Sequence, residues 1–92
     1  MSIPKKGSFL LNLDDDQFRW IAKGKDGKTE IKVQLNEVPD GQMLVGIAPK
    51  VFQNRMVEDL IDKGIELGWS PMDWDDNLVL QYRKGQWVQP RD

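Results

Sequence analysis

Two acidic clusters supply residue types that could bind a metal ion. Asp14-Asp15-Asp16 and Asp73-Trp74-Asp75-Asp76 offer carboxylate oxygens, the ligands that magnesium and calcium prefer. Neither cluster has the alternating ligands, central glycine and terminal glutamate of an EF-hand calcium loop. We interpret both clusters as solvated turns, and we expect neither a metal site nor a cofactor.

The segment Glu30-Ile31-Lys32 superficially resembles the E-x-K arrangement of metal-dependent nucleases, in which carboxylates hold the metal and the lysine supports the attacking water. A three-residue match arises often by chance, and alternation on a solvent-exposed strand face explains it more simply. The chain has no His and no Cys, which excludes Ser-His and Cys-His catalysis, disulfides and the usual zinc sites within it. We therefore expect no catalytic residue and no enzyme, and keep a metal-dependent nuclease-like enzyme as the second alternative.

A basic group could contact phosphates. It consists of Arg19, Lys23, Lys25, Lys28 and Lys32. The nearby aromatic residues Phe18 and Trp20 belong to the opposite, core-facing set of side chains, so the stacking surface of a single-strand binder is missing. The net charge of −2 and the pI near 5.1 also argue against a nucleic-acid partner.

An acidic surface is the stronger candidate for binding. It comprises Glu58, Asp59, Asp62, Glu66, Asp73, Trp74, Asp75 and Asp76. Lys63 is the main opposing charge, and Asp62 and Glu66 are like charges one helical turn apart, which is mildly destabilising. Such a surface could dock a basic protein partner, because charge speeds the encounter and an aromatic side chain supplies an anchor. A solvated outer face remains the alternative explanation.

Small-ligand binding is the main rival function. The ligand would enter a pocket between the helix and the sheet, lined by Trp20, Phe52, Trp69 or Trp87. A thermal-shift panel separates the two hypotheses, because a ligand that binds only the folded state raises the unfolding midpoint.

The first hairpin is the clearest element that positions these residues. Asp26-Gly27 suits the positive φ angles of a two-residue type I′ turn. The resulting register places large apolar residues on one face, in the pairs Ala22 with Ile31, Trp20 with Val33 and Phe18 with Leu35. The other face pairs Lys23 with Glu30, Ile21 with Lys32 and Arg19 with Gln34. A short helix that begins at Asp14 and stops at Gly24 remains open for residues 14–23.

A second turn, Val38-Pro39-Asp40-Gly41, predicts a three-residue hairpin loop. Closing the loop there pairs Leu35 with Val45 and Val33 with Ile47. One face of a meander would then carry Trp20, Val33, Leu35, Val45 and Ile47. Phe9–Leu13 adds an earlier strand, and Leu78–Arg83, bounded by Asn77 and Lys84-Gly85, predicts a final one.

After Ala48 the apolar period changes from two to about three and a half residues. Pro49 suits the first turn of a helix, and Gly68 followed by Trp69 and Pro71 ends it. The helix presents one stripe, formed by Met56, Val57, Leu60, Ile61, Gly64 and Leu67. Gly64 within this stripe costs about 1 kcal/mol relative to Ala, which indicates a close approach of the helix to the sheet.

The composition predicts one folded domain over residues 1–92, with residues 1–7 and 89–92 as loose termini. Hydrophobic residues make up 39% of the chain and charged residues 30%, an ordinary globular balance. No signal-type apolar run or membrane span is present, so we expect a cytoplasmic protein without a membrane partner.

The fold class is α+β: a two-layer domain in which one helix packs on one face of an antiparallel four- or five-stranded meander sheet.

The segment from Ile47 to Leu80 resembles the closing helix and strand of many small uncharacterised bacterial accessory proteins, including immunity-type and mobile gene-cassette proteins. The resemblance rests on Ile47-Ala48-Pro49, on Glu66-Leu67-Gly68-Trp69-Ser70-Pro71 and on Leu78-Val79-Leu80, and it covers less than half of the chain. It implies a bacterial origin and an accessory role, and it carries over no functional residue. We therefore expect a non-catalytic binding protein that docks another protein, and the sequence leaves a homo-oligomer open.

Overall fold

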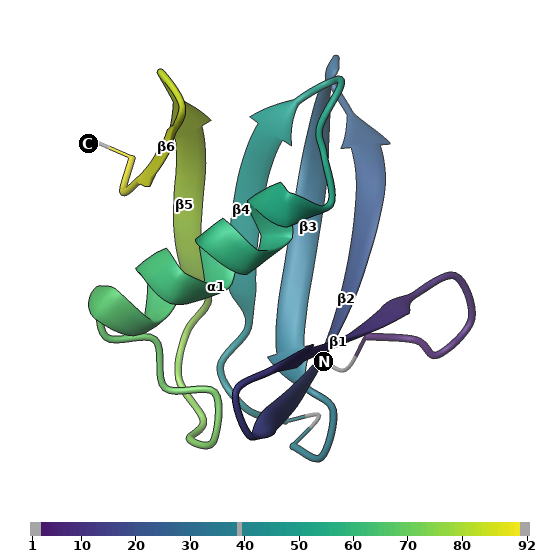
Figure 1. Cartoon of the computed structure of the whole chain (residues 1–92), viewed down its shortest axis with the longest axis vertical. Helices are drawn as coiled ribbons and strands as arrows, with labels where there is room; N and C mark the ends of the chain where they lie inside the picture. Colours follow the sequence, from purple (N-terminus) through teal and green to yellow (C-terminus); the bar gives the residue numbers. More distant parts are fainter. Residues whose placement is uncertain (1–2, 39, 91–92) are drawn as a thin grey trace.

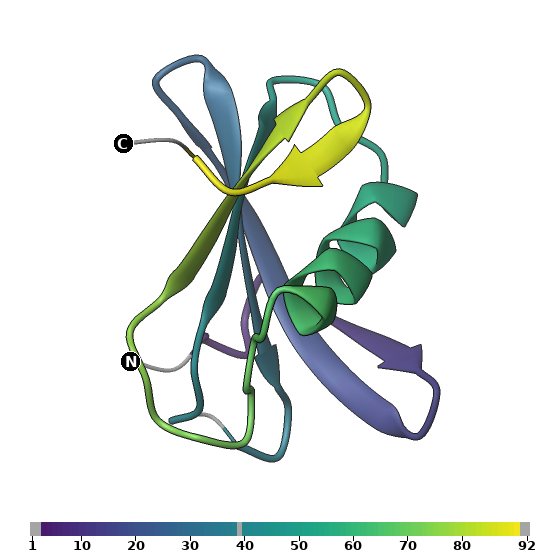
Figure 2. The same cartoon turned by 90° about the vertical axis from the view of Figure 1, so that its left-hand side faces the viewer.

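The computed structural model describes residues 3–38 and 40–90, which form one sheet and one helix (Figure 1). The elements, in chain order, are β1 (Phe9–Leu13), β2 (Asp16–Lys25), β3 (Lys28–Leu35), β4 (Leu44–Pro49), α1 (Arg55–Glu66), β5 (Leu78–Arg83) and β6 (Gln86–Val88). The strands follow one another in the sheet in the order β1-β2-β3-β4-β5-β6, and α1 covers one face. Both edge strands curl toward the helix (Figure 2).

The α+β class with one helix on a mostly antiparallel sheet agrees with the prediction, but the described part of the chain has six strands rather than four or five. The additional strand is β6, which pairs with β5 across the turn at Lys84-Gly85. The sheet is also not a complete meander, because β5 runs parallel to β4. A parallel neighbour requires a crossover connection, and α1 with its flanking segments provides it.

The first hairpin has the predicted register at every pair. Phe18 lies opposite Leu35, Trp20 opposite Val33 and Lys25 opposite Lys28. Asp26 and Gly27 have φ angles of 51° and 78°, as a type I′ turn requires. Residues 16–25 are therefore strand, and the alternative of a short helix over residues 14–23 is wrong. The alternation of apolar and polar residues, which buries one strand face, outweighs the capping pattern at Asp14.

The predicted register between β3 and β4 is wrong. Val33 lies opposite Leu44 rather than Ile47, so Leu44 faces the helix while Val45 and Ile47 lie on the other face. The Gly41 amide does donate to the Val38 carbonyl at 3.0 Å, but this contact does not close the ladder between β3 and β4. Gly41 and Gln42 instead contact the segment between α1 and β5. Pro39, within the predicted turn, lies outside the described residues.

The helix has the predicted apolar stripe, and Met56, Val57, Leu60, Ile61 and Gly64 are buried. It begins at Arg55, so the placement of Pro49 in its first turn is wrong. Pro49 is instead the last residue of β4, where a missing N–H is tolerated at a strand end. Gly68, with φ of 98°, follows the last turn as expected.

Two apolar clusters lie on opposite faces of the sheet. The larger fills the space between α1 and the sheet, and includes Phe18, Trp20, Leu44, Leu60 and Trp87. The smaller lies on the face away from the helix, which we call the open face, and consists of Ile3, Ile21, Met43 and Val45 with Ile47 packed against it.

The described parts of the two termini differ in burial. Ile3 is buried, and its amide donates to Gln34 Oε1 at 3.1 Å. Gln89 and Pro90 are exposed, whereas residues 1–2 and 91–92 of the predicted loose ends lie outside the described residues. Within the described ranges, no helix is long and apolar enough to cross a membrane.

Candidate functional site

The segment between α1 and β5 brings Trp74 to the open face. From the end of the helix the chain descends, crosses beneath the sheet and rises on the other side into β5 (Figure 2). Trp74 lies on this crossing segment and is 82% exposed. The predicted anchor residue is therefore outside the core, on the side of the sheet that the helix leaves uncovered.

Gln42 holds this crossing segment in place with four hydrogen bonds. Its backbone amide donates to the Asp73 carbonyl at 2.7 Å, and its side-chain Nε2 donates to the Asp76 carbonyl at 2.9 Å. Its Oε1 accepts from the Ser70 amide at 2.7 Å, and its carbonyl accepts from Trp69 Nε1 at 2.9 Å. Gln42 is itself buried. A buried, hydrogen-bonded residue thus holds both ends of the loop that carries Trp74.

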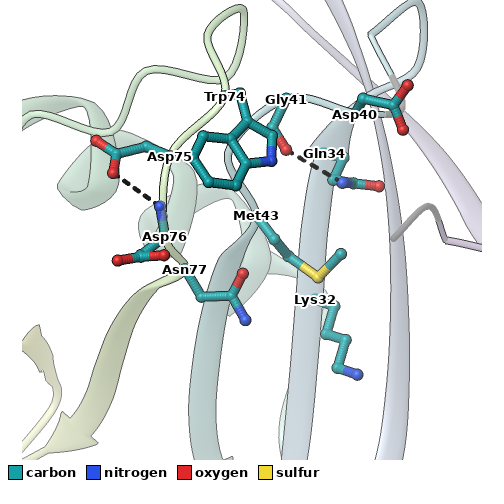
Figure 3. A pocket seen from close by; sticks show the side chains of 9 residues that line it. All are labelled: Lys32, Gln34, Asp40, Gly41, Met43, Trp74, Asp75, Asp76 and Asn77. Atoms are coloured by element: carbon teal, nitrogen blue, oxygen red, sulfur yellow. Dashed lines mark hydrogen bonds between the residues drawn. The ribbon is translucent and has the colours of Figure 1, made fainter.

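Gly41 allows the two segments to approach this closely. A Cβ on Gly41 would collide with the carbonyl group of Pro71, so the two backbones are in direct contact. Asp40, the residue before Gly41, is thereby placed across from Asp75 and Asp76 on the rim of one hollow (Figure 3).

The hollow beside Trp74 has a volume of about 460 Å³ and is partly open to solvent. Strand β3, the β3–β4 connection and the crossing segment all contribute to its wall. Its lining residues are Lys32, Gln34, Asp40, Gly41, Met43, Trp74, Asp75, Asp76 and Asn77. In Figure 3 the indole stands at its upper rim, above Met43 and between the acidic residues on either side.

The rim of this Trp74 hollow is mainly acidic. Among the ion pairs between described residues, none involves Asp40, Asp75 or Asp76, and Asp75 Oδ1 accepts a hydrogen bond from the Asp76 amide at 2.7 Å. Lys32, the one cation in the lining, is 3.7 Å from Glu30 Oε1 and is thus directed toward a carboxylate outside the hollow. The rim therefore carries three carboxylates whose charge the fold does not neutralise directly.

The structure divides the predicted acidic surface into separate parts. Asp59, Asp62 and Glu66 line a different hollow of about 320 Å³, together with Lys63 and the β5–β6 turn on the helix side. Glu58 lies at a third hollow, near the start of α1 and β1. No residue is shared between the Trp74 hollow and either of these. The acidic residues of the helix and those around Trp74 are consequently two surfaces on opposite sides of the sheet.

The four aromatic residues named for a ligand pocket belong to the packed core. Trp20, Trp69 and Trp87 are buried, and Phe52 packs against the same cluster. Their polar atoms are used internally, since Trp87 Nε1 donates to the Met56 carbonyl at 2.9 Å and Trp69 Nε1 to Gln42. Trp20, Phe52 and Trp87 reach three separate surface hollows, one each. The structure therefore does not bring the four together around one hollow among those it describes.

The basic residues of the first hairpin lie together on the open face, because the register of β2 and β3 places them there. They are Arg19, Lys23, Lys25, Lys28 and Lys32. Glu30 contacts two of them, Lys25 at 3.8 Å and Lys32 at 3.7 Å. Arg19 donates to Asn36 Oδ1 and Ser8 Oγ. Within residues 3–38 and 40–90, no three acidic side chains are grouped so that they could hold a metal ion.

Sequence reasoning named Trp74, Asp75 and Asp76 but missed Asp40, Met43 and Asn77 as parts of the same hollow. The sequence indicated Asp40 only as a turn residue. Its position near Asp75 and Asp76 depends on the contact between Gly41 and Pro71, which no local sequence pattern encodes. No protein-family model matches this chain, and no curated protein or solved structure matches it at a significant level either.

Proposed function

We propose that this chain is a non-catalytic binding protein that docks a basic segment of another protein in the Trp74 hollow. One observation carries the proposal: a tryptophan that is 82% exposed stands on a loop that hydrogen bonds to Gln42 hold in place, and three carboxylates line the same hollow. The weak resemblance to bacterial accessory proteins fits this role, and we include a bacterial, cytoplasmic setting in the proposal.

The exposed indole favours a macromolecular partner. A large aromatic side chain left in water gains free energy when a partner covers it, and tryptophan is among the residues that most often dominate binding interfaces. The other three tryptophans are buried in the core. Trp74 therefore contributes nothing comparable to the core, and its exposure is best explained by a surface that another molecule covers.

The charge of the rim selects the chemistry of the partner. Carboxylates at Asp40, Asp75 and Asp76 attract an arginine or lysine side chain, and the face of the indole can stack on the same cation. Met43 provides an apolar floor for the methylene groups of that side chain. A basic segment with an exposed arginine is thus complementary to the hollow in both charge and shape.

The proposal can be tested with a synthetic peptide in which arginine and leucine alternate, titrated into the isotope-labelled protein. The indole N–H signal of Trp74 should shift first, and a glutamate version of the peptide should leave it unchanged. Trp74→Ala should speed dissociation at every salt concentration, whereas Asp75→Asn with Asp76→Asn should mainly slow association and weaken its salt dependence. Both asparagine variants preserve the backbone contacts of the loop and so act on charge alone.

The matched control is Asp59→Asn with Asp62→Asn, which removes the same charge from the helix side. If this pair weakens binding as much as the Asp75 and Asp76 pair does, the proposal of a specific site is wrong and only net charge matters. Affinity capture from a bacterial lysate, with the Trp74→Ala chain as the parallel bait, then identifies the natural partner. A partner that both baits retain equally would contradict docking in the Trp74 hollow.

A further inference from the structure

The outer edge of β1 combines exposed apolar side chains with unused backbone hydrogen-bonding groups. Phe9 and Leu10 are 55% and 50% exposed, and β1 is the first strand of the sheet order, with a neighbour on one side only. Its sequence, Phe-Leu-Leu-Asn-Leu, contains no charge and no proline, the features with which single-chain proteins normally protect such an edge. This edge is therefore suited to pairing with another strand.

The register of the β1–β2 hairpin shows which backbone groups face outward. Leu13 and Asp16 flank the two-residue turn, so they form a hydrogen-bonded pair, and Leu11 with Phe18 forms the next one. Leu10 and Asn12 lie at the intervening positions, opposite Arg19 and Gln17. In an antiparallel ladder these positions point their N–H and C=O groups away from the neighbouring strand.

Side chains keep this edge extended. On the open face, Arg19 donates to Ser8 Oγ at 2.7 Å and to Asn36 Oδ1 at 3.0 Å. Asn36 Nδ2 donates to Gln17 Oε1 at 2.8 Å, and Gln17 Nε2 donates to Asn12 Oδ1 at 3.2 Å. The chain of hydrogen bonds runs from one end of β1 to the other. The strand is thus held on β2 before any partner arrives, which lowers the entropy cost of pairing.

We propose that β1 pairs antiparallel with β1 of a second copy of this chain, about a twofold axis at Leu11. In that register Leu10 lies opposite Asn12 of the second copy, and Asn12 opposite Leu10 of the second copy. These are the positions whose backbone groups face outward, so four hydrogen bonds can form without any shift. The two sheets become one continuous sheet, and the interface is isologous.

The side chains are complementary to their own copies in this arrangement. On the helix side, Phe9 lies opposite Leu13 of the second copy, and the reverse pair forms as well. The two copies of Leu11 lie opposite each other at the twofold axis. Phe9 already stacks on Trp20 with ring centroids 4.8 Å apart, at a hollow beside the start of α1 that Leu11 and Trp20 also line. The apolar surface at this edge is therefore continuous with the core, and a second β1 would extend it.

Charge also favours an antiparallel second copy. Lys5 and Lys6 precede β1. Asp14 and Asp15 form the turn that follows it, and Asp16 comes directly after the turn. Antiparallel pairing brings the basic end of one copy beside the acidic turn of the other, twice in each dimer. A parallel arrangement would place like charges together, so the charge pattern selects the antiparallel register.

The test measures molecular mass by sedimentation from micromolar to millimolar concentration, together with amide exchange. We expect a dimer at high concentration, in which the amides of Leu10 and Asn12 become protected while those of Phe9 and Leu11 are protected at any concentration. Dimers mixed from labelled and unlabelled chains should show a contact between the Hα atoms of Leu11, because that pair is not hydrogen-bonded and lies closest.

Two variants block the edge in different ways. Leu10→Pro removes an outward N–H, and Leu10→Lys with Asn12→Lys places lysines opposite one another across the axis. Each variant should be monomeric at all concentrations tested. If Leu10→Pro does not fold, the double lysine variant provides the test. Gln86→Lys with Gln89→Lys adds the same charge at the β6 edge and should leave the dimer intact.

A wild-type protein that stays monomeric throughout the concentration range would overturn the proposal. So would a dimer that persists in a folded variant of either kind, since its interface would lie elsewhere. Charge reversal supplies an independent check: Lys5→Asp with Lys6→Asp should weaken the dimer, and adding Asp15→Lys with Asp16→Lys should restore it. Failure of this restoration would contradict the antiparallel arrangement.

Discussion

A Cβ added to Gly64 would lie 2.8 Å from Cδ2 of Leu44, so α1 and β4 meet at a point that has no room for a side chain. Leu44 is completely buried and cannot move aside freely. The same residue pair explains why a glycine that disfavours the helix stands in the middle of its apolar stripe.

Gly64→Ala should therefore lower the free energy of unfolding by about 1 to 3 kcal/mol, the usual cost of overpacking. At a solvent-exposed position inside a helix, the same change would stabilise the protein by about 1 kcal/mol. The sign of the effect therefore shows whether Gly64 is in close contact with the sheet. Urea unfolding of Gly64→Ala, Leu44→Ala and the double variant measures it. The double variant should lose less than the sum of the single losses, and additive losses would show that the two residues are not in contact.

Leu60→Ala should cost about 2 to 5 kcal/mol, because Leu60 is fully buried between α1 and the sheet. Ile65→Ala is the control on the same helix, since Ile65 is largely exposed and its loss should change stability by less than about 0.5 kcal/mol. Thermal and urea unfolding compare the two. Similar losses at both positions would mean that the buried stripe is not the principal contact of the helix.

Gly27→Val should destabilise the first hairpin by about 1 to 2 kcal/mol or more, because a β-branched residue resists a φ of 78°. Space is not the reason, since an added Cβ at Gly27 meets nothing within 4 Å. Gly24→Val tests this directly, because Gly24 is equally open but does not have a positive φ, and Lys28→Ala is a second neutral control. Equal melting temperatures for Gly27→Val and Gly24→Val would contradict the turn assignment.

Gln42→Leu should cost about 1 to 3 kcal/mol by leaving the Ser70 amide and the Asp76 carbonyl without their side-chain partner. Amide exchange at Ser70 should become faster. Gln42→Glu keeps the acceptor for Ser70 and loses only the donor to Asp76, so Ser70 should stay protected in that variant. Slow exchange at Ser70 in both variants would show that the crossing segment does not depend on Gln42.

Fluorescence quenching by acrylamide should be dominated by Trp74, because the other three tryptophans are buried. Trp74→Ala should remove most of the quenchable emission while leaving the melting temperature within about 1 to 2 °C of the wild type. An unchanged quenching curve in that variant would show that the indole is not exposed in solution.

Short-range features of the sequence were enough to predict the first hairpin and the helix, because turns, caps and apolar periods involve residues close together in the chain. The Asp26-Gly27 turn and the alternation of apolar residues on either side of it leave only one register that buries Phe18, Trp20 and Val33 together. The helix stripe and its stop at Gly68 were predictable for the same reason, because caps and period act within a few residues. Lys84 and Gly85 form a turn with similar φ angles of 51° and 81°, and Gly85 was the local signal from which β6 could have been predicted.

The candidate site was predictable only in part. Trp74, Asp75 and Asp76 stood out because an aromatic residue among carboxylates is not needed by the core, but nothing local separates them from Asp59 and Asp62. That separation arises because the segment after α1 crosses beneath the sheet, and Gln42 and Gly41 hold it there. The hydrogen bonds and close contacts involved join residues about thirty positions apart.

Long-range packing decided three features that the sequence patterns misassigned or could not specify: the β3–β4 register, the parallel pairing of β5 and the division of the acidic residues. Gly46 illustrates the physical reason. A Cβ there would lie 2.7 Å from Cδ2 of Leu60 and 2.9 Å from the ring of Trp87, so this position of β4 must face both the helix and the last hairpin. A one-residue shift would place Val45 or Ile47 in that space, and neither fits where only a glycine does.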